Sequence, residues 1–349
     1  MRVAFYTNSV SPHQLPLYER VAEKCDFRYI SINLDWRGKK IDTSCKVLLS
    51  ESYEAKDWLE KCDVLILDRR DLGLIERRCR KGLKTFFGSE RWLKPIIVAG
   101  VSCSGRIRTL VPSYRKMAKR FVELTKKYEC FKVLPYGVWA ERDFEWLGVP
   151  KEKMDVWGYF VAPSASEKLK VEGQRSDGGI KVLWAGRAQV EWKRLKDVER
   201  AVELINSRVE GKEGRKIVLD VVANVSLEKV REEMRKHDVF VMASNAYEGW
   251  GAVVNEALEE GMAVIGTYEA GSSATILPRE VLYHSGDVKA LANLLRRLDV
   301  EKWRKVEGDL YRANWTAENG AKRMLALINP EKCPSVVVNT LDFCPRDMR

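Results

Sequence analysis

The sequence predicts an α/β protein of two domains, each built on an open parallel sheet with helices on both faces, with the two sheets facing each other across a cleft. Short apolar runs that suit buried strands alternate with amphipathic segments along most of the chain. A polar stretch that contains Ser, Pro and a Gly pair, residues 163–179, divides this alternation into two series. Both series open with a strand, a loop and a helix, so we expect two similar α/β domains joined by this linker.

The first predicted domain, residues 1–162, starts with a strand at 2–7 that leads through a polar loop into a helix at 15–24. Further strands are predicted at 27–32, 63–68, 95–99 and 131–134, with one more just before 88–92. Further helices are predicted at 55–61, 74–82, 106–127 and 138–147. Strands that alternate with helices in this way are typical of a parallel sheet.

The second predicted domain, residues 180–328, repeats this pattern. Its strands are predicted at 180–185, 217–223, 238–244, 263–267 and 281–284. Its helices are predicted at 197–205, 227–236, 252–260, 288–298, 300–314 and 316–327, and a loop at 270–273. Residues 329–349 are expected to form a tail that packs near the first domain.

Composition favours a globular protein. Of the 349 residues, 45% are hydrophobic, which is enough for two cores. The N-terminus lacks the apolar centre of a signal peptide, and no apolar run approaches the ~18 residues of a membrane span, so we expect a soluble, cytoplasmic protein. The eight cysteines show no CxxC spacing, which favours buried thiols over zinc ligands or a redox pair. Only Cys333 and Cys344 suggest a disulfide.

Positive charge is concentrated in the first domain. The chain carries a net charge of +11, and residues 1–162 hold 31 Lys and Arg against 21 Asp and Glu. Residues 106–127 hold eight basic residues and one acid, with apolar residues at helical spacing, so they predict a basic amphipathic helix. Its surface candidates are Arg115, Lys116, Lys119 and Arg120. Such a helix can bind an anionic membrane surface or nucleic-acid phosphates, or it can simply be solvated.

The most informative stretch is residues 244–267, which contains two carboxylates, Glu248 and Glu256, around a glycine-rich turn. A strand, this turn, a helix and a further strand are expected to follow one another here, with Gly261 ending the helix and Glu259 and Glu260 exposed. The start of such a helix attracts anions, and a carboxylate on either side could meet hydroxyl groups. The spacing suits a nucleotide sugar. On spacing alone, helix capping by Glu248 and solvation of Glu256 is an equal alternative.

The string EGWGAVVNEALEEGMAVIGT resembles the E-x7-E signature of family 4 retaining glycosyltransferases, which have the GT-B fold of two Rossmann-like domains. LWAGRAQVEWK, residues 183–193, resembles the strand and Gly-Arg…Lys pattern of the same family. The strings SERW and PYGVWAERDFEWLGVPKEKM resemble segments of its N-terminal domain. The resemblance spans nearly the whole chain and is strongest over residues 182–267.

This resemblance implies roles for particular residues. Arg187 and Lys193, with backbone N–H groups near Gly249 and Gly251, would stabilise the leaving diphosphate without a metal. Glu248 would contact the donor sugar and Glu256 the ribose. Gly186 and Trp250 complete the predicted donor-binding set.

Residues of the first domain are also candidates. His13 lies in the first loop after a strand, where it could orient the acceptor or the donor sugar. Glu90 and Arg91 could line the acceptor side. Of the other histidines, His237 is expected to be structural, and His284 is left open.

The sequence departs from the family pattern in three places. The loop after the first strand is NSVSPHQ rather than a double-glycine loop. Asp68 or Arg69 occupies the region where the N-terminal domain usually has a catalytic histidine. The segment 221–230 is shorter than the family's base-binding loop, so the sequence does not identify the nucleotide.

The predicted function is therefore that of a retaining, metal-independent glycosyltransferase that uses a UDP- or GDP-sugar, without a cofactor, on a lipid, glycan or protein acceptor. It would be cytoplasmic, with peripheral binding to the inner face of a membrane through residues 106–127 as one option. Two alternatives stay open, which are a glycosyltransferase that modifies nucleic acid and a non-catalytic protein that binds nucleotide sugars or nucleic acid.

Overall fold

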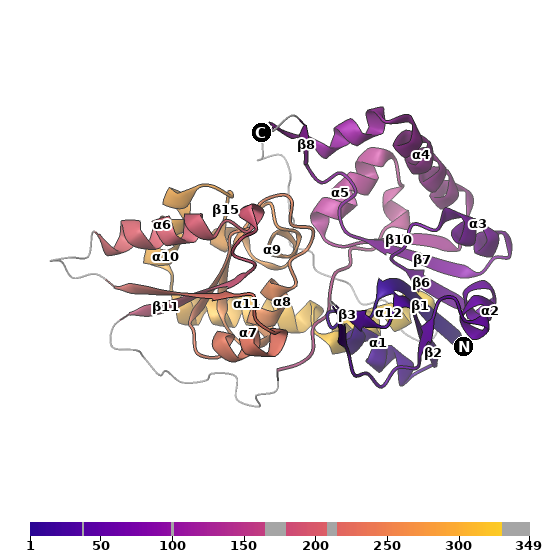
Figure 1. The fold of residues 1–349 in the computed structure, drawn as a ribbon, viewed down its shortest axis with the longest axis horizontal. Coiled ribbons are helices and arrows are strands. Elements are labelled where there is room, and N and C mark those ends of the chain that lie inside the picture. The colour runs from indigo at the N-terminus through magenta and orange to yellow at the C-terminus, as the bar shows by residue number, and fades with distance from the viewer. Residues whose placement is uncertain (37, 99–100, 165–178, 208–214, 330–349) are drawn as a thin grey trace. The chain divides into compact units, whose positions relative to one another are not determined.

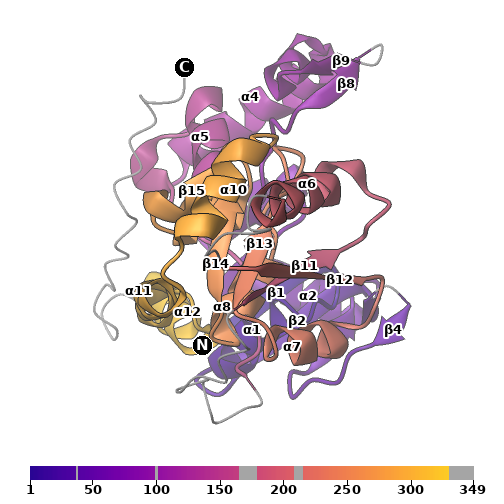
Figure 2. The ribbon, with the colours of Figure 1, turned by 90° about the vertical axis from the view of Figure 1, so that its left-hand side faces the viewer.

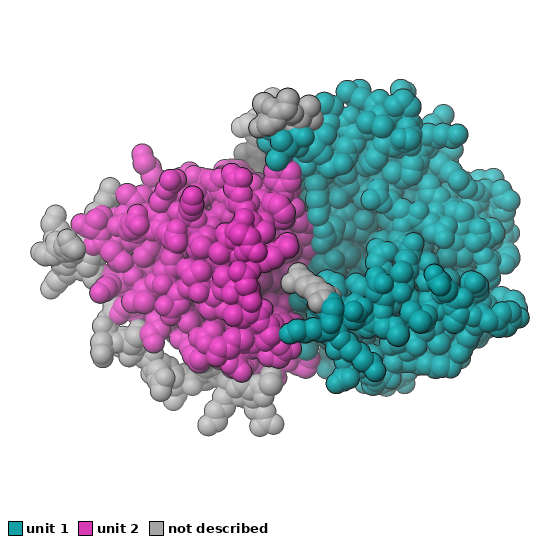
Figure 3. All heavy atoms as spheres, viewed as in Figure 1, with its two compact units in different colours: residues 1–162, 317–337 teal, residues 163–316, 338–349 magenta. Residues whose placement is uncertain are grey.

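A computed structural model describes residues 1–36, 38–98, 101–164, 179–207 and 215–329 (Figure 1). The chain forms two compact units, coloured separately in Figure 3. Of the described residues, unit 1 comprises 1–162 and 317–329, and unit 2 comprises those from 163 to 316. Most of the predicted linker and both cysteines of the suggested disulfide, Cys333 and Cys344, lie outside the described residues, as does nearly all of the predicted tail.

Unit 1 is built on a six-stranded sheet with the order β10-β7-β6-β1-β2-β5, in which neighbouring strands are parallel. The strands are β1 (Arg2–Ser9), β2 (Asp26–Asn33), β5 (Val47–Leu49), β6 (Val64–Leu67), β7 (Lys84–Ser89) and β10 (Phe131–Pro135). Two hairpins, β3 (Asp35–Trp36) with β4 (Lys39–Lys40) and β8 (Ile96–Val98) with β9 (Val101–Cys103), stand outside this sheet. The sequence prediction missed the short strands β3, β4, β5 and β9, which have too few residues to show a period.

The helices of unit 1 are α1 (Leu15–Ala22), α2 (Tyr53–Lys61), α3 (Leu72–Arg80), α4 (Pro112–Lys127), α5 (Val138–Leu147) and α12 (Ala317–Ile328), with short 3-10 helices η1 (Gly105–Leu110) and η2 (Lys151–Lys153). Local signals explain several boundaries. Ser52 and Asp71 accept hydrogen bonds from the backbone N–H groups of Ala55 and Leu74, which caps α2 and α3. Gly148 ends α5 in the left-handed region, at φ 101°.

The predicted helix at 106–127 is two elements. Pro112 starts α4, because proline has no N–H to donate and its fixed φ suits the first helical turn. Residues 105–110 form η1 instead. Leu110, expected on the apolar stripe, is therefore 76% exposed, while Phe121 and Leu124 are buried in the core.

The last helix, α12, belongs to unit 1, whereas the predicted domain boundary of 328 placed it with the second domain. It packs along α1. A Cβ added to Gly320 would lie 2.5 Å from the Phe160 ring, and the Arg323 guanidinium lies 4.7 Å from the centre of the Trp157 ring. The apolar stripe of α12 was visible in the sequence, but its partner lies far away along the chain.

Unit 2 is built on a five-stranded parallel sheet with the order β12-β11-β13-β14-β15. The strands are β11 (Ile180–Gly186), β12 (Ile217–Ala223), β13 (Val239–Met242), β14 (Ala263–Thr267) and β15 (Leu282–Tyr283). The helices are α6 (Leu195–Asn206), α7 (Leu227–Met234), α8 (Val253–Glu259), α9 (Gly271–Ile276), α10 (Val288–Arg297) and α11 (Val300–Asn314), with 3-10 helices η3 (Glu191–Lys193) and η4 (Arg279–Val281). Helices α6 and α10 cover one face of the sheet, and α7, α8 and α11 the other (Figure 2).

Two expectations for unit 2 are wrong. Of residues 270–273, predicted as a loop, 271–273 open helix α9. Glu260, expected to be exposed, is 4% exposed, because its carboxylate accepts from Arg231 (2.6 Å) and Arg235 (3.0 Å) of α7, which compensates the buried charge. Gly261 ends α8 as expected, with φ 76°.

Within the described residues, no helix has the length and apolar character needed to cross a bilayer. No cluster of three or more His, Cys, Asp or Glu side chains suited to a metal ion occurs in that part of the chain.

Candidate functional site

Two of the three predicted catalytic residues of unit 2, Lys193 and Glu248, meet where the loops after β11 and β13 leave the sheet. Lys193, in η3, forms an ion pair with Glu248, which lies in the loop between β13 and α8. Their side chains are 18% and 15% exposed. The Asn245 N–H donates to the Trp192 carbonyl at 2.9 Å, so the backbones of the two loops are also joined. Two residues that are far apart in the sequence thus form one charged site at the carboxyl edge of a parallel sheet, where α/β proteins bind ligands.

The loop that carries Glu248 is held by both side chains and backbone. Asn245 accepts from the N–H groups of Tyr247 (3.0 Å, to Oδ1) and Glu248 (2.9 Å, to the carbonyl). Gly251 has φ 89°, a conformation that L side chains rarely adopt, which explains the glycine here. This turn brings Glu248 over the end of the sheet.

Helix α9 is hydrogen-bonded to the same loop and packs closely against it. The Ser272 N–H donates to the Trp250 carbonyl, and its hydroxyl donates to the Gly251 carbonyl, both at 2.9 Å. A Cβ on Gly271 would lie 2.2 Å from the Gly249 carbonyl oxygen, so only glycine permits this approach. Sequence reasoning missed this contact, although the Gly-Ser-Ser string was a signal for close backbone packing.

Two predicted donor-binding residues lie deeper than expected. Trp250 is 0% exposed, donates to the Asn255 side chain at 2.8 Å and packs at a tilt against Trp315, so its indole is a core group rather than a surface for the donor. Glu256 lies on α8 and is 3% exposed.

Arg187 and Gly186 stand at the end of β11. Arg187 is exposed and makes no ion pair with the described residues. Gly186 packs over Trp184, because a Cβ there would lie 3.2 Å from the indole. Arg187 lies in the same loop as Lys193, and its guanidinium is available to bind an anion.

The two histidines of unit 2 differ. His237 is 3% exposed and is held by Asp220 at 2.7 Å and the Glu233 carbonyl at 2.6 Å, in line with the predicted structural role. The His284 Nδ1 atom lies 3.0 Å from a Glu269 carboxylate oxygen, and the centre of its ring lies 4.9 Å from that of Tyr268.

In unit 1, His13 follows β1 and lies near two aromatic rings, with its ring centre 5.8 Å from that of Trp36 and 6.2 Å from that of Tyr159. Glu90 contacts Lys94 at 2.6 Å and accepts from the Tyr159 hydroxyl at 3.2 Å. It therefore lies in the same cluster of side chains as His13.

Arg91 faces a different partner from Glu90. It pairs with Asp143 at 3.3 Å, and that carboxylate also accepts from the Leu93 N–H at 2.9 Å. With side chains 13% and 8% exposed, this pair fastens the 90–94 loop to α5, so Arg91 has a structural task rather than a place on the acceptor side.

Asp68 is a further polar residue at the carboxyl edge of unit 1. It follows β6, and one oxygen accepts from Thr7 of the adjacent strand β1 at 2.7 Å. Burial raises the pKa of Asp68 to about 6, although hydrogen bonds from Thr7 and Gln14 act against the shift. The chain runs from β1 outward to β2 and β5 and then returns to β6 on the other side of β1, so Thr7 and Asp68 straddle the switch point of the sheet.

The four basic candidates of α4 lie on its outer face. Arg115, Lys116, Lys119 and Arg120 are all exposed. Arg120 pairs with Glu76 at 2.6 Å, and Lys119 lies 3.9 Å from Glu123.

Solved structures with similar folds define the class. The UDP complex of Alr3699/HepE from Anabaena is 12% identical, covers 95% of this chain and 100% of its own, and superposes with a TM-score of 0.60. The lipopolysaccharide outer core galactosyltransferase WaaB is 13% identical, covers 95% of this chain and 99% of its own, and superposes with a TM-score of 0.63. A glycosyltransferase from Rickettsia africae is 12% identical, covers 94% of this chain and 98% of its own, and superposes with a TM-score of 0.59. The chain therefore has the GT-B fold, as the sequence predicted.

Residues 164–299 match the sequence model of the family described as Glycosyl transferases group 1. The matched region lies within unit 2 and includes Arg187, Lys193, Glu248 and Glu256. A search of curated proteins found no match to this sequence. The fold and the matched region together support a glycosyltransferase.

Proposed function

We propose that this chain is a retaining glycosyltransferase that transfers a sugar from a UDP-sugar to a lipid, glycan or protein acceptor. The observation that carries the proposal is the Lys193–Glu248 ion pair at the carboxyl edge of the unit 2 sheet, inside the region matched by the glycosyltransferase model. A cation there can meet the leaving diphosphate, and the adjacent carboxylate can accept hydrogen bonds from the sugar.

The charges of the site suit a diphosphate. Negative charge grows on the leaving phosphate as the glycosidic bond breaks, so cations placed beside it stabilise the transition state more than the ground state. Lys193 is half-buried, which strengthens its electrostatic interactions, and Arg187 is exposed nearby in the sequence with a planar fork for phosphate oxygens. Gly249 and Gly251 support the same role because neither has a side chain that would keep a ligand away.

The choice of UDP rests on the relatives. The Anabaena protein was solved with UDP and with UDP-glucose. We propose UDP over GDP for this chain on that basis, with Glu248 at the sugar, Glu256 toward the ribose and no requirement for a metal. His13 would act at the sugar or acceptor from unit 1.

A thermal-shift screen tests the donor assignment, since a ligand that binds only the folded state raises its stability. UDP and UDP-glucose should raise the unfolding temperature in the presence of a chelator, and GDP should not. Lys193→Met should strongly reduce the shift at the same UDP concentration, while Lys229→Met, which alters an exposed pair on α7, should keep it. Absence of any shift with UDP and UDP-glucose would refute the donor assignment.

Turnover separates an enzyme from a binding protein. Release of UDP from UDP-glucose supports transfer or hydrolysis, and NMR of the released or transferred sugar gives its anomeric configuration. An α-configured product supports retention, and a β-configured product contradicts it. If the protein binds UDP-glucose but releases no UDP with any acceptor tested, the non-catalytic alternative is indicated.

Peripheral association with an anionic membrane through residues 106–127 is part of this proposal, because a lipid acceptor would be reached at a bilayer surface. Nucleic acid is the competing partner for the same basic residues.

A further inference from the structure

The start of helix α4 combines exposed apolar side chains with unpaired positive charge. Pro112 separates α4 from η1, and this break directs the residues just before it outward. Leu110 is 76% exposed, Val111 is 51% exposed and Ile107 is 37% exposed. We refer to these three residues as the apolar tip.

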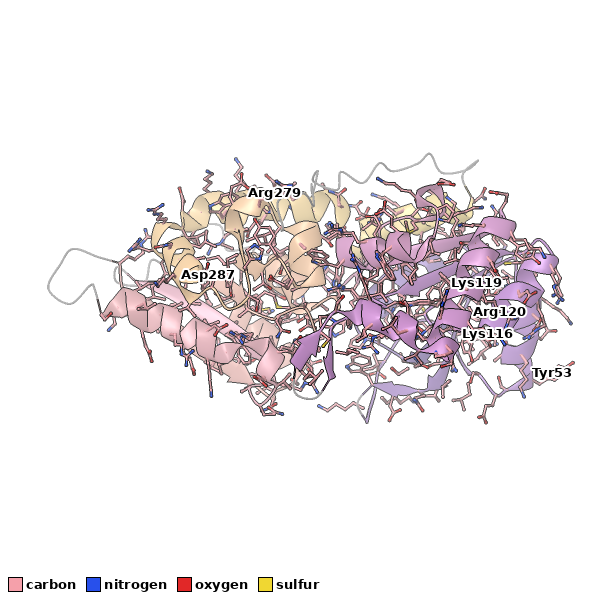
Figure 4. The ribbon with its side chains drawn as sticks, turned by 90° about the horizontal axis from the view of Figure 1, so that it is seen from above. Tyr53, Lys116, Lys119, Arg120, Arg279 and Asp287 are labelled. Atoms are coloured by element: carbon pink, nitrogen blue, oxygen red, sulfur yellow. The ribbon has the colours of Figure 1, made fainter. Side chains whose placement is uncertain are left out.

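Basic residues flank the apolar tip in the sequence. Arg106 is exposed in η1, and Arg115, Lys116 and Lys119 are exposed in α4. Figure 4 shows Lys116 and Lys119 projecting from the outer face of α4 together with Arg120. Arg115 and Lys116 form no ion pair with described residues, whereas Glu76 neutralises Arg120 at 2.6 Å. The acid nearest Lys119 is Glu123, at 3.9 Å.

This combination distinguishes between anionic partners. A nucleic acid offers phosphates for the basic residues but no apolar phase for Leu110 and Val111. An anionic bilayer offers both, since its headgroups attract Lys and Arg while its acyl boundary receives apolar side chains. Leaving two large aliphatic residues in water is also unfavourable, and contact with the bilayer would remove that exposed area.

The geometry points to an anionic membrane as the partner of this surface: we propose that the apolar tip inserts at the acyl boundary while Arg115, Lys116 and Lys119 contact the headgroups. This inference rests on the proposed function, because membrane binding serves a transferase whose acceptor is a lipid. It adds to that function the residues that would bring a lipid acceptor within reach. The surface lies wholly within unit 1.

Vesicle sedimentation of the full-length protein tests the two contributions separately. The wild type should bind vesicles containing about one quarter phosphatidylglycerol and should bind pure phosphatidylcholine much more weakly. Lys116→Gln with Lys119→Gln should lower the affinity by roughly 25-fold, at about fivefold per charge. Leu110→Ser with Val111→Ser should lower it by about tenfold or more and should remove the fraction of binding that survives high salt.

Matched controls have the same chemistry elsewhere. Lys229→Gln with Lys236→Gln removes one exposed charge from α7 and one just after it, and Tyr53→Ser removes an 88% exposed aromatic residue from α2. Both should bind vesicles like the wild type. All substituted side chains are exposed or half-exposed, so thermal unfolding should be nearly unchanged, and a circular dichroism melt verifies this for each variant.

Three results would overturn the proposal. They are no binding of the wild type to anionic vesicles, full binding by the Leu110→Ser, Val111→Ser variant, and binding to duplex DNA that is tighter than to the vesicles at equal salt. The UDP-induced thermal shift is measured without vesicles. A protein that binds UDP but not vesicles therefore refutes the membrane surface alone, and one that binds vesicles but not UDP refutes the donor site alone.

Discussion

Opposite effects on UDP affinity are expected from the two halves of the Lys193–Glu248 pair. Both side chains are less than one fifth exposed, at 18% and 15%, so their interaction lies between that of a surface pair and a buried one. If the diphosphate takes Lys193, then Lys193→Met removes a charge-assisted contact worth about 1.5–3 kcal/mol, which is roughly 10- to 150-fold in affinity. Glu248→Gln removes the competitor for Lys193 and a negative charge beside the ligand, so UDP should bind about equally well or a few-fold tighter.

Titration calorimetry with UDP and UDP-glucose on both variants and on the double variant measures these effects. Glu248→Gln should lose the added affinity that the glucose provides, because its carboxylate is proposed to accept from the sugar hydroxyls. The double variant should bind UDP like Lys193→Met, since Glu248 no longer has a lysine to compete for. Wild-type UDP affinity in Lys193→Met, or equal weakening by both single changes, would refute this division of roles.

Three further predictions concern the scaffold. Gly271→Ala should weaken UDP binding at least tenfold and destabilise the protein by about 2 kcal/mol or more, because its Cβ would lie 2.2 Å from a carbonyl of the donor loop; wild-type calorimetry would contradict this. Arg78→Met should cost about 3–5 kcal/mol in urea unfolding, since Arg78 is 0% exposed and donates to the carbonyls of Leu59 and Cys62 at 2.8 and 2.9 Å; a loss below about 1 kcal/mol would exclude that role. The pKa of Asp68 is raised from 3.8 to about 6, so the folded state holds its proton more tightly and wild-type stability should fall as pH rises through this window. Asp68→Asn should remove that fall. The free energy of unfolding of this variant, minus that of the wild type, should therefore rise by up to about 3 kcal/mol from acid to neutral pH. Parallel curves of unfolding free energy against pH for the two proteins would refute the pKa shift.

Local signals were sufficient for much of the fold. Apolar runs and helical spacing predicted β12, β14, α5 and α11 with the bounds that the structure gives. Gly148 and Gly261 mark helix ends because only glycine takes the left-handed conformation without cost. The alternation of strands and helices predicted two α/β domains, and the resemblance implied the GT-B class, which the structural relatives confirm.

Tertiary contacts decided what the sequence pattern could not. Residues Gly271–Ile276 have a loop-like composition, but their backbone is held by the Glu248 loop and forms α9. Glu260 carries a charge that predicts exposure, yet two arginines of α7 compensate it in the interior. The side to which α12 packs depends on α1, nearly the whole chain away.

The candidate site was predicted as a set of residues rather than as contacts. Sequence spacing and resemblance selected Lys193 and Glu248, and the structure joins them in an ion pair. Trp250 and Arg91 were selected by the same reasoning, but an indole with no exposed surface and a guanidinium bound to Asp143 have structural roles. Spacing along a chain cannot distinguish a polar side chain that faces a ligand from one that faces its own core.

A structure of the protein with UDP is the most direct test of the donor site. The diphosphate should lie beside the loops after β11 and β13, with an oxygen about 3 Å from the Lys193 ammonium and from a backbone N–H of Gly249–Gly251. Lys193 should then have left Glu248. UDP bound at another edge of unit 2, or bound here with the Lys193–Glu248 pair intact, would contradict the proposed role of the pair.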